Sequence, residues 1–196
     1  MPKLIGAAAA CLVLGAVLAG TSCSNAITVK AAVKPEKDRK TAPEFSLKDA
    51  NGQTVHLADY KGKVVLLDFW ATWCGPCKVE IPWFMEFEQQ FKDRGFAVLG
   101  VSMDEGGWDD VKPYIQDLKI NYRILLGNEE ISDLYGGLDS LPTTLLIDRQ
   151  GKVASVHIGL SQGKEEFRND IAHLLDTVNA ANAPSHSDRT LFAAAK

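Results

Sequence analysis

Cysteine is scarce in this sequence, and the shortage excludes several kinds of site. Only four of the 196 residues are cysteines, and the body of the chain holds two of them, Cys74 and Cys77. A framework of structural disulfides needs more than one pair, and a bridge across so short a loop adds little stability because loop-closure entropy grows with loop length. A structural zinc site needs four ligands, and the histidines are too scattered to complete one. They are His56, His157, His173 and His186.

A basic face is missing as well. The formal net charge is −4, and residues 1–40 hold six basic side chains against two acidic ones, so the rest of the chain holds 15 basic and 23 acidic side chains. Nucleic acids bind to basic surfaces, and this acidic body therefore argues against nucleic acid as a partner. The hydrophobic content of 46% and the length fit one globular domain with appendages.

Long apolar runs are absent except for one, residues 4–19, which follows Lys3 and contains no charged side chain. A basic start followed by an apolar stretch is the layout of a secretory signal, and this run is short for a membrane span, which takes about 20 residues. Cys23 resembles the lipid-modified cysteine of bacterial lipoproteins, although Gly20 stands where those sequences usually carry leucine. We therefore expect residues 1–23 to be a signal peptide or a lipoprotein anchor segment. Cleavage without lipidation and an uncleaved anchor remain open.

The rest of the chain divides into three segments. Residues 24–42 contain no aromatic side chain and no sustained period of a helix or strand, so we expect a flexible tether. Residues 43–180 carry alternating apolar segments, and we expect them to form the folded domain. Residues 181–196 are rich in small residues, and we expect a disordered tail.

Within the domain, apolar periodicity predicts alternating strands and helices. The expected strands cover residues 45–47, 54–57, 63–70, 96–102, 123–126, 143–148 and 152–158. The expected helices run from the cysteines to Gly95 and over residues 108–118, 129–135 and 164–178. This order predicts an α/β, three-layer domain in which helices flank a central mixed β-sheet, with an N-terminal β-hairpin extension.

The two body cysteines form a Cys-x-x-Cys pair at the start of a helix that follows a buried strand, the expected setting of a redox pair. The free N–H groups and positive dipole at a helix N-terminus favour a thiolate at Cys74, which makes it the attacking sulfur. Cys77 lies one turn deeper and is expected to be the resolving thiol. Pro76 suits the first helical turn, and Gly75 permits the close approach of a partner backbone.

The stretch DFWATWCGPCK (68–78) resembles the active-site strand, turn and helix start of thioredoxins. Residues 43–180 as a whole resemble the exported, membrane-tethered TlpA/ResA-like thiol–disulfide oxidoreductases of that superfamily. The supporting segments are PEFSLKDANGQ, CKVEIP and LPTTLLIDRQGKV (141–153). The resemblance implies a thioredoxin-like fold.

The resemblance also implies roles for single residues beside the cysteines. Pro142 matches the family's cis-proline, which would bring the Leu141 backbone beside the disulfide, where a substrate chain could pair; a trans proline at the start of a strand is the alternative. Trp73 matches the aromatic residue that flanks the attacking cysteine. Its alternative is simple packing.

Two acidic residues complete the expected site. Asp68 matches the buried proton acceptor of thioredoxins near the resolving cysteine, whereas many exported relatives have asparagine at this place. Glu80 lies on the same helical face as Cys77, and the matching residue of ResA-like proteins is buried and tunes the thiols; an exposed helix carboxylate is the alternative. The division of labour between the two acids stays open. A further pair, Asp104 and Glu105, is expected to be a solvated loop without a role.

These expectations favour a reductase of exported protein disulfides that uses no cofactor beyond the Cys74–Cys77 disulfide and no metal. A transmembrane thiol carrier would supply electrons, and apocytochrome c is the substrate class that the resemblance implies, with general disulfide repair as the close alternative. Reduction of peroxide is a second class of function, but it usually needs a Thr-x-x-Cys segment, and Thr72 is only two residues before Cys74. A non-catalytic scaffold is the third class, and two intact cysteines argue against it.

Overall fold

The computed structural model describes residues 33–161 and 163–181, and it contains each helix and strand expected from the sequence. The strands are β1 (Ser46–Asp49), β2 (Thr54–His56), β3 (Val64–Trp70), β4 (Phe96–Ser102), β5 (Arg123–Leu126), β6 (Thr143–Ile147) and β7 (Val153–Ile158). The helices are α1 (Gly75–Phe91), α2 (Trp108–Asp117), α3 (Glu129–Leu134) and α4 (Lys164–Ala181). Short 3-10 turns occur at η1 (Glu36–Asp38), η2 (Leu57–Tyr60) and η3 (Lys92–Arg94).

The strands form one mixed sheet of seven, in the order β2-β1-β5-β4-β3-β6-β7. Strands β3, β4 and β5 run parallel to one another, β6 runs antiparallel to β3, and β7 runs antiparallel to β6. The N-terminal hairpin of β1 and β2 joins the sheet through antiparallel pairing of β1 with β5. The carboxyl ends of the three parallel strands therefore meet at one edge of the sheet, which we call the cysteine edge because Cys74 follows β3 there.

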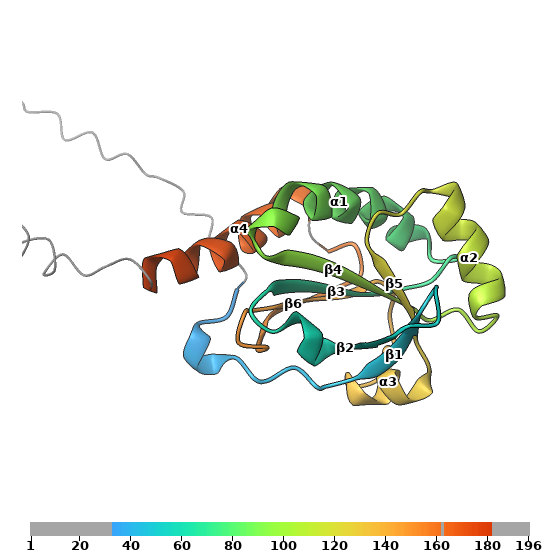
Figure 1. Ribbon diagram of the computed structural model, residues 1–196, viewed down its shortest axis with the longest axis horizontal. Helices are drawn as coiled ribbons and strands as arrows, with labels where there is room; N and C mark the ends of the chain where they lie inside the picture. Colours follow the sequence, from blue (N-terminus) through green and yellow to red (C-terminus); the bar gives the residue numbers. More distant parts are fainter. Residues whose placement is uncertain (1–32, 162, 182–196) are drawn as a thin grey trace, which may run out of the picture. The chain divides into compact units, whose positions relative to one another are not determined.

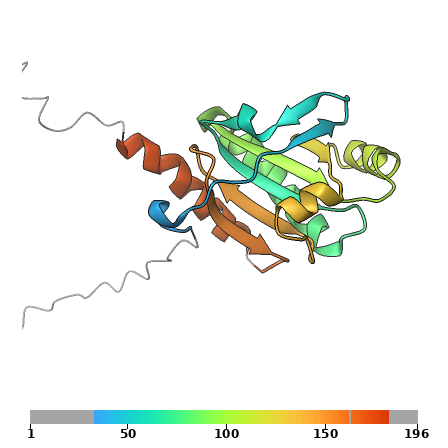
Figure 2. The same ribbon diagram turned by 90° about the horizontal axis from the view of Figure 1, so that it is seen from below.

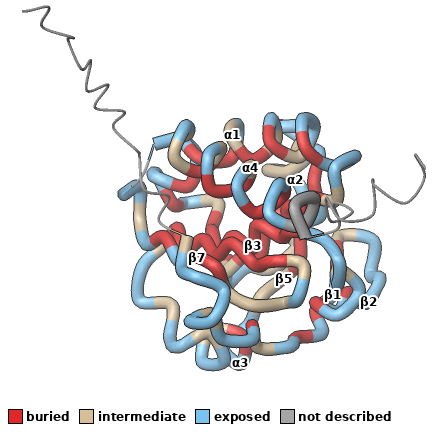
Figure 3. The backbone as a smooth tube through the Cα atoms, turned by 90° about the vertical axis from the view of Figure 1, so that its left-hand side faces the viewer, coloured by how far each residue is buried: buried red, intermediate tan, exposed pale blue. Residues whose placement is uncertain are grey.

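Helices cover both faces of the sheet, which confirms the three-layer prediction. Figure 1 shows α1 and α4 on one face and α3 on the other. The core under α1 and α4 includes Phe84 and Phe167, whose rings meet edge to face with centroids 5.5 Å apart. The opposite core holds Phe69 and Ile131, from β3 and α3. Figure 3 shows the buried residues gathered along the sheet and on the inner sides of the helices. Burial on both sides explains why every residue of β3 except Asp68 is apolar.

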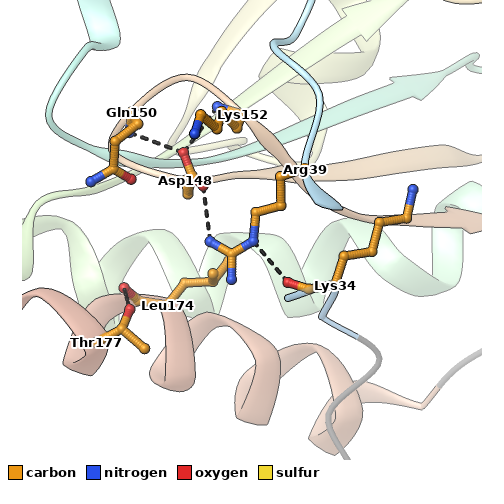
Figure 4. A network of polar contacts seen from close by, with 7 residues as sticks. All are labelled: Lys34, Arg39, Asp148, Gln150, Lys152, Leu174 and Thr177. Carbon is orange, nitrogen blue, oxygen red and sulfur yellow. Dashed lines mark hydrogen bonds and ion pairs between the residues drawn. The ribbon is translucent and has the colours of Figure 1, made fainter. Parts of the chain in front are cut away.

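Residues 33–42, which we call the strap, were expected to belong to the flexible tether, and for these residues that expectation is wrong. The Lys34 N–H donates to the Ala154 carbonyl at 2.8 Å, and the Val153 N–H donates to the Lys40 carbonyl at 2.8 Å. Arg39 forms an ion pair with Asp148 at 2.9 Å, and both side chains are buried. Figure 4 shows this network beside α4. The folded domain therefore begins at the strap rather than at residue 43.

The strap attaches at the edge of the sheet opposite the cysteines. Its partners are the first residues of β7 and the turn after β6, and β6 leaves the cysteine edge at Thr143 and ends beside Val65 at the opposite edge. Figure 2 shows the chain continuing from the strap across the sheet toward β1. The segment 1–23 with Cys23, residues 24–32 and residues 182–196 lie outside the described residues. Among the described helices, none combines the length and apolar character that crossing a bilayer requires.

Candidate active site

The two cysteines lie at the amino-terminal end of α1 and form a disulfide with a Cα–Cα distance of 5.3 Å. Cys74 is the N-cap residue, and its Sγ accepts the Cys77 N–H at 3.2 Å. Pro76 occupies the first turn of the helix, where a missing N–H has no cost. Each feature matches the sequence-based expectation of a sulfur held on the N–H groups of a helix start.

The surroundings of the pair are apolar. Cys74 is 4% exposed and Cys77 is 1% exposed, so both residues are buried, Cys74 slightly less than Cys77, and both belong to the core under α1. Open space surrounds Gly75, since a Cβ built there would meet no atom within 4 Å. A partner backbone can therefore approach the disulfide over Gly75, as expected.

Trp73 directly precedes Cys74, and the Leu141–Pro142 bond lies at the same edge of the sheet. Trp73 is 69% exposed, which excludes a packing role in the interior. The Leu141–Pro142 peptide bond is cis, and Pro142 directly precedes β6 at the cysteine edge. The Pro142 carbonyl accepts the Gly159 N–H at 2.7 Å, which ties the proline loop to the end of β7. Leu141 is half-buried and packs against both cores.

Asp68 is a buried carboxyl in the middle of the sheet. It is 1% exposed, and its neighbours in register are Gly100 on β4 and Thr144 on β6. The Thr144 hydroxyl donates to Asp68 Oδ1 at 3.1 Å. Burial raises the pKa of Asp68 to about 7, and the hydrogen bond from Thr144 opposes this shift. A group with this pKa can hold or release a proton near neutral pH.

Glu80 is a second buried carboxyl, on the α1 face that carries Cys77. It is 1% exposed, so the alternative of an exposed helix carboxylate is wrong. Neither of its oxygens has a hydrogen-bond partner among the described residues. Burial raises the pKa of Glu80 to about 8, and the charge of Asp68 adds to the shift. An unpartnered carboxyl in an apolar site is stable only when it is protonated.

Two aromatic residues that the sequence did not single out lie in the same buried region. The Trp70 Nε1 and the Tyr122 hydroxyl are buried, and neither has a hydrogen-bond partner among the described residues. Burial first, then the charges of Asp68, Tyr114 and Glu80, raise the pKa of Tyr122 well above its ordinary value. This interaction places Tyr122 near both acids. Trp70 ends β3, where strand propensity alone explains an aromatic residue, and Tyr122 directly precedes β5, so the sequence gave no indication that the two share a buried region.

Asp104 is the site residue that sequence reasoning missed, and the expectation of a solvated loop is wrong for it. Asp104 follows β4 at the cysteine edge and is 6% exposed, whereas its neighbour Glu105 is exposed. The Thr72 N–H donates to the two oxygens of Asp104 at 3.0 and 3.1 Å, and the Thr72 hydroxyl donates to Oδ1 at 2.5 Å. The carboxylate thus holds the loop that leads to Cys74.

Within residues 33–161 and 163–181, no three His, Cys, Asp or Glu side chains are grouped so that they could hold a metal ion. The three histidines in this part of the chain lie apart, His56 and His173 exposed and His157 buried. What the described residues do bring together is a disulfide between Cys74 and Cys77 and two buried carboxyl groups, Asp68 and Glu80, a set that suits sulfur exchange and proton transfer.

Comparisons with known proteins point to the same chemistry. A profile of the AhpC/TSA family matches residues 39–156. The chain is 34% identical over 161 residues to the thiol-disulfide oxidoreductase ResA of Geobacillus thermodenitrificans, which covers 82% of this chain and 89% of that protein. A candidate thiol:disulfide interchange protein DsbE of Chlorobium tepidum has a solved structure with 34% identity and a TM-score of 0.66, covering 70% of this chain and 96% of that one. The exposed lipoprotein thioredoxin of Streptococcus pneumoniae has 30% identity and a TM-score of 0.58, covering 67% and 99%.

Proposed function

This chain belongs to the AhpC/TSA family and is a thiol–disulfide oxidoreductase, and from that premise we propose that it works outside the cytoplasm as a reductase of disulfides in exported proteins. The observation that carries the proposal is the Cys74–Cys77 disulfide at the start of α1, with the Cys74 sulfur held on a helix N–H. Gly75 and Pro76 between the cysteines resemble the reducing members of the thioredoxin superfamily. The cysteine pair itself is the redox group, and no further cofactor is needed.

The reaction follows from the order of the two sulfurs. In the reduced protein, the Cys74 thiolate attacks one sulfur of a substrate disulfide, forms a mixed disulfide and releases the other substrate sulfur as a thiolate. Cys77 then loses its proton and attacks Cys74 Sγ, which releases the second substrate thiolate and forms the Cys74–Cys77 disulfide. The substrate gains two electrons and the protein loses two. A dithiol donor returns them by the reverse exchange.

The proton of Cys77 needs an acceptor, and we assign this role to Asp68. Its pKa of about 7 lets it accept a proton while it is ionised and return the proton in the next cycle. Glu80, with a pKa of about 8, is largely protonated at neutral pH and adds no second negative charge to the region. With Glu80 protonated, the two acids together carry one negative charge when Asp68 is ionised and none when Asp68 is protonated.

For partners and location, the proposal follows the family resemblance. We propose a transmembrane thiol carrier as electron donor and apocytochrome c as a substrate, with general disulfide repair as the alternative. The apolar run of residues 4–19 supports export, and Cys23 supports a lipid anchor, as in the exposed lipoprotein thioredoxin of Streptococcus pneumoniae. The intact mass of protein extracted from membranes tests the anchor: a diacylglyceryl adduct on Cys23 is expected, and an unmodified mature N-terminus contradicts it.

Peroxide reduction, the chemistry of a related class, has less support. Thr72 is one residue too close to Cys74 for the Thr-x-x-Cys segment of that chemistry, and its hydroxyl donates its hydrogen bond to Asp104. The hydroxyl is therefore committed to holding the loop.

Reduction of insulin disulfides with dithiothreitol as electron donor tests the proposed function. We expect the wild-type chain to accelerate insulin reduction well above the rate with dithiothreitol alone, and Cys74→Ser to return the rate to that background, because the attacking thiolate is lost. Cys77→Ala should hold substrates on Cys74 as mixed disulfides. Consumption of peroxide at a comparable rate, or turnover by Cys74→Ser equal to wild type, would contradict the proposal.

A further inference from the structure

Asp104 has a set of contacts that stability alone does not explain. Its carboxylate accepts three hydrogen bonds from Thr72, and a fourth from the Ser102 hydroxyl at 2.8 Å. The Asp104 N–H returns a bond to the same Ser102 oxygen at 3.2 Å. None of the ion pairs among the described residues includes Asp104. Burying a carboxylate that only neutral groups contact costs free energy. The arrangement of hydrogen bonds around Asp104 therefore suggests a role beyond joining two segments of the chain.

The contacts fasten the end of β4 to the loop that precedes the attacking cysteine. Thr72 is two residues before Cys74, and the Cys74 N–H donates to the Ala71 carbonyl at 3.1 Å. One residue before Asp104, the Met103 N–H donates to the Trp70 carbonyl at 2.8 Å. Hydrogen bonds to Met103 and Asp104 therefore fix the loop between β3 and α1 at Trp70, where the loop begins, and at Thr72, in its middle. Its free side carries Trp73, which is exposed.

We propose that Asp104 is a positioning residue for disulfide exchange, which acts through Thr72 to keep Cys74 Sγ on the N–H groups at the start of α1. The inference rests on the proposed function. The sulfur lies 3.2 Å from the Cys77 N–H in the present geometry, and a displacement of the loop moves the sulfur away from that donor. The thiolate then loses the helix-terminal stabilisation that makes it form near neutral pH. Asp104 acts on neither sulfur directly; it fixes the backbone that carries Cys74 Sγ.

The test is the pH profile of Cys74 alkylation in the reduced protein, with the modified cysteine identified by mass spectrometry. We expect Asp104→Ala and Thr72→Val to move the midpoint of the profile up by about one pH unit, which makes alkylation about tenfold slower below the midpoint. Thr72→Ser keeps the hydroxyl and should restore the wild-type profile. Glu105→Gln, a change in the exposed carboxylate next to Asp104, is the matched control and should leave the profile unchanged.

The direction of the shift separates positioning from a direct effect of charge. If Asp104 acted on the thiolate by its negative charge, Asp104→Asn would lower the midpoint, and that result would overturn the inference. An unchanged midpoint in a variant that only melts at a lower temperature would also overturn it and leave Asp104 a structural residue. Thr72→Val keeps the Thr72 N–H bonds and tests the idea if Asp104→Ala fails to fold. Alkylation needs no turnover, so a wild-type chain that fails to reduce insulin refutes the proposed function without deciding this inference.

Discussion

Asp148 at the strap edge and the pair Asp68 and Glu80 are all buried acids, but their surroundings are opposite. Asp104, at the cysteine edge, resembles Asp148 in accepting several hydrogen bonds. At the strap edge, Asp148 is 4% exposed, pairs with Arg39 at 2.9 Å and also accepts the N–H groups of Gln150 and Lys152 at 3.0 and 2.9 Å. At the cysteine edge, Glu80 is 1% exposed and has no hydrogen-bond partner among the described residues. Asp68 beside it accepts one side-chain hydrogen bond, from Thr144.

The difference separates a carboxylate that holds the fold from one that exchanges protons. A buried acid with a charged partner and several donors has a fixed geometry. A buried acid with few donors has a raised pKa and changes its protonation state near the pH at which the protein works. The strap edge can therefore be rigid while the cysteine edge changes charge during each reaction cycle. Mutations at the two edges should consequently affect different measurements.

The largest effect on stability is expected at the strap. Arg39→Ala leaves Asp148 buried without its cation, and we expect the free energy of unfolding to fall by about 3 kcal/mol. Urea denaturation measures the fall. Alkylation of Cys74 in the native protein should stay at the wild-type rate, because the strap attaches at the edge opposite the cysteines.

A matched control exists on the same side of the molecule. Arg94 pairs with Asp176 at 2.7 Å, but both side chains are largely exposed, so Arg94→Ala should change the stability by less than about 1 kcal/mol. If both variants lost the same free energy of unfolding, burial of the Arg39–Asp148 pair would make no difference to stability. The strap edge would then not be stabilised by its buried acid.

The contrast also marks what the sequence could predict. The apolar run of β3 and the DFWATWCGPCK segment are local patterns, and they were sufficient for the order of elements, the helix start at Cys74 and the placing of Asp68 and Glu80. The strap has no such pattern, because its fixed position depends on a pair between residues 109 apart in sequence, Arg39 and Asp148. Asp104 was missed for the same reason. Its partner Thr72 is 32 residues away, and an Asp-Glu pair after a strand usually indicates a solvated loop.

At the cysteine edge, Asp68→Asn should affect turnover more than folding. Asparagine has nearly the same size and can still accept the Thr144 hydrogen bond, but it cannot take the proton of Cys77. We expect insulin reduction to slow by at least about tenfold near pH 7, with a urea midpoint close to that of wild type. Turnover equal to wild type at that pH would remove Asp68 as the proton acceptor and leave Glu80 as the candidate.

The smallest effect is expected from Glu80→Gln, and it appears in the pH dependence of stability. The pKa of Glu80 is about 8 in the folded protein and near 4.5 in an unfolded chain, so between these values the folded state binds a proton that the unfolded state has released. The free energy of unfolding therefore falls as the pH rises through this window, by up to about 1 kcal/mol per pH unit from this one group. Glu80→Gln should flatten the fall between about pH 5 and 8, as measured by urea denaturation at a series of pH values.

Glu86→Gln changes an acid on the same helix whose pKa is lowered, first by Lys164 and then by Arg168, and should leave the fall in place. If both variants followed the wild-type curve, Glu80 would be ionised in the folded state, and the cysteine edge would hold its acids no differently from the strap edge.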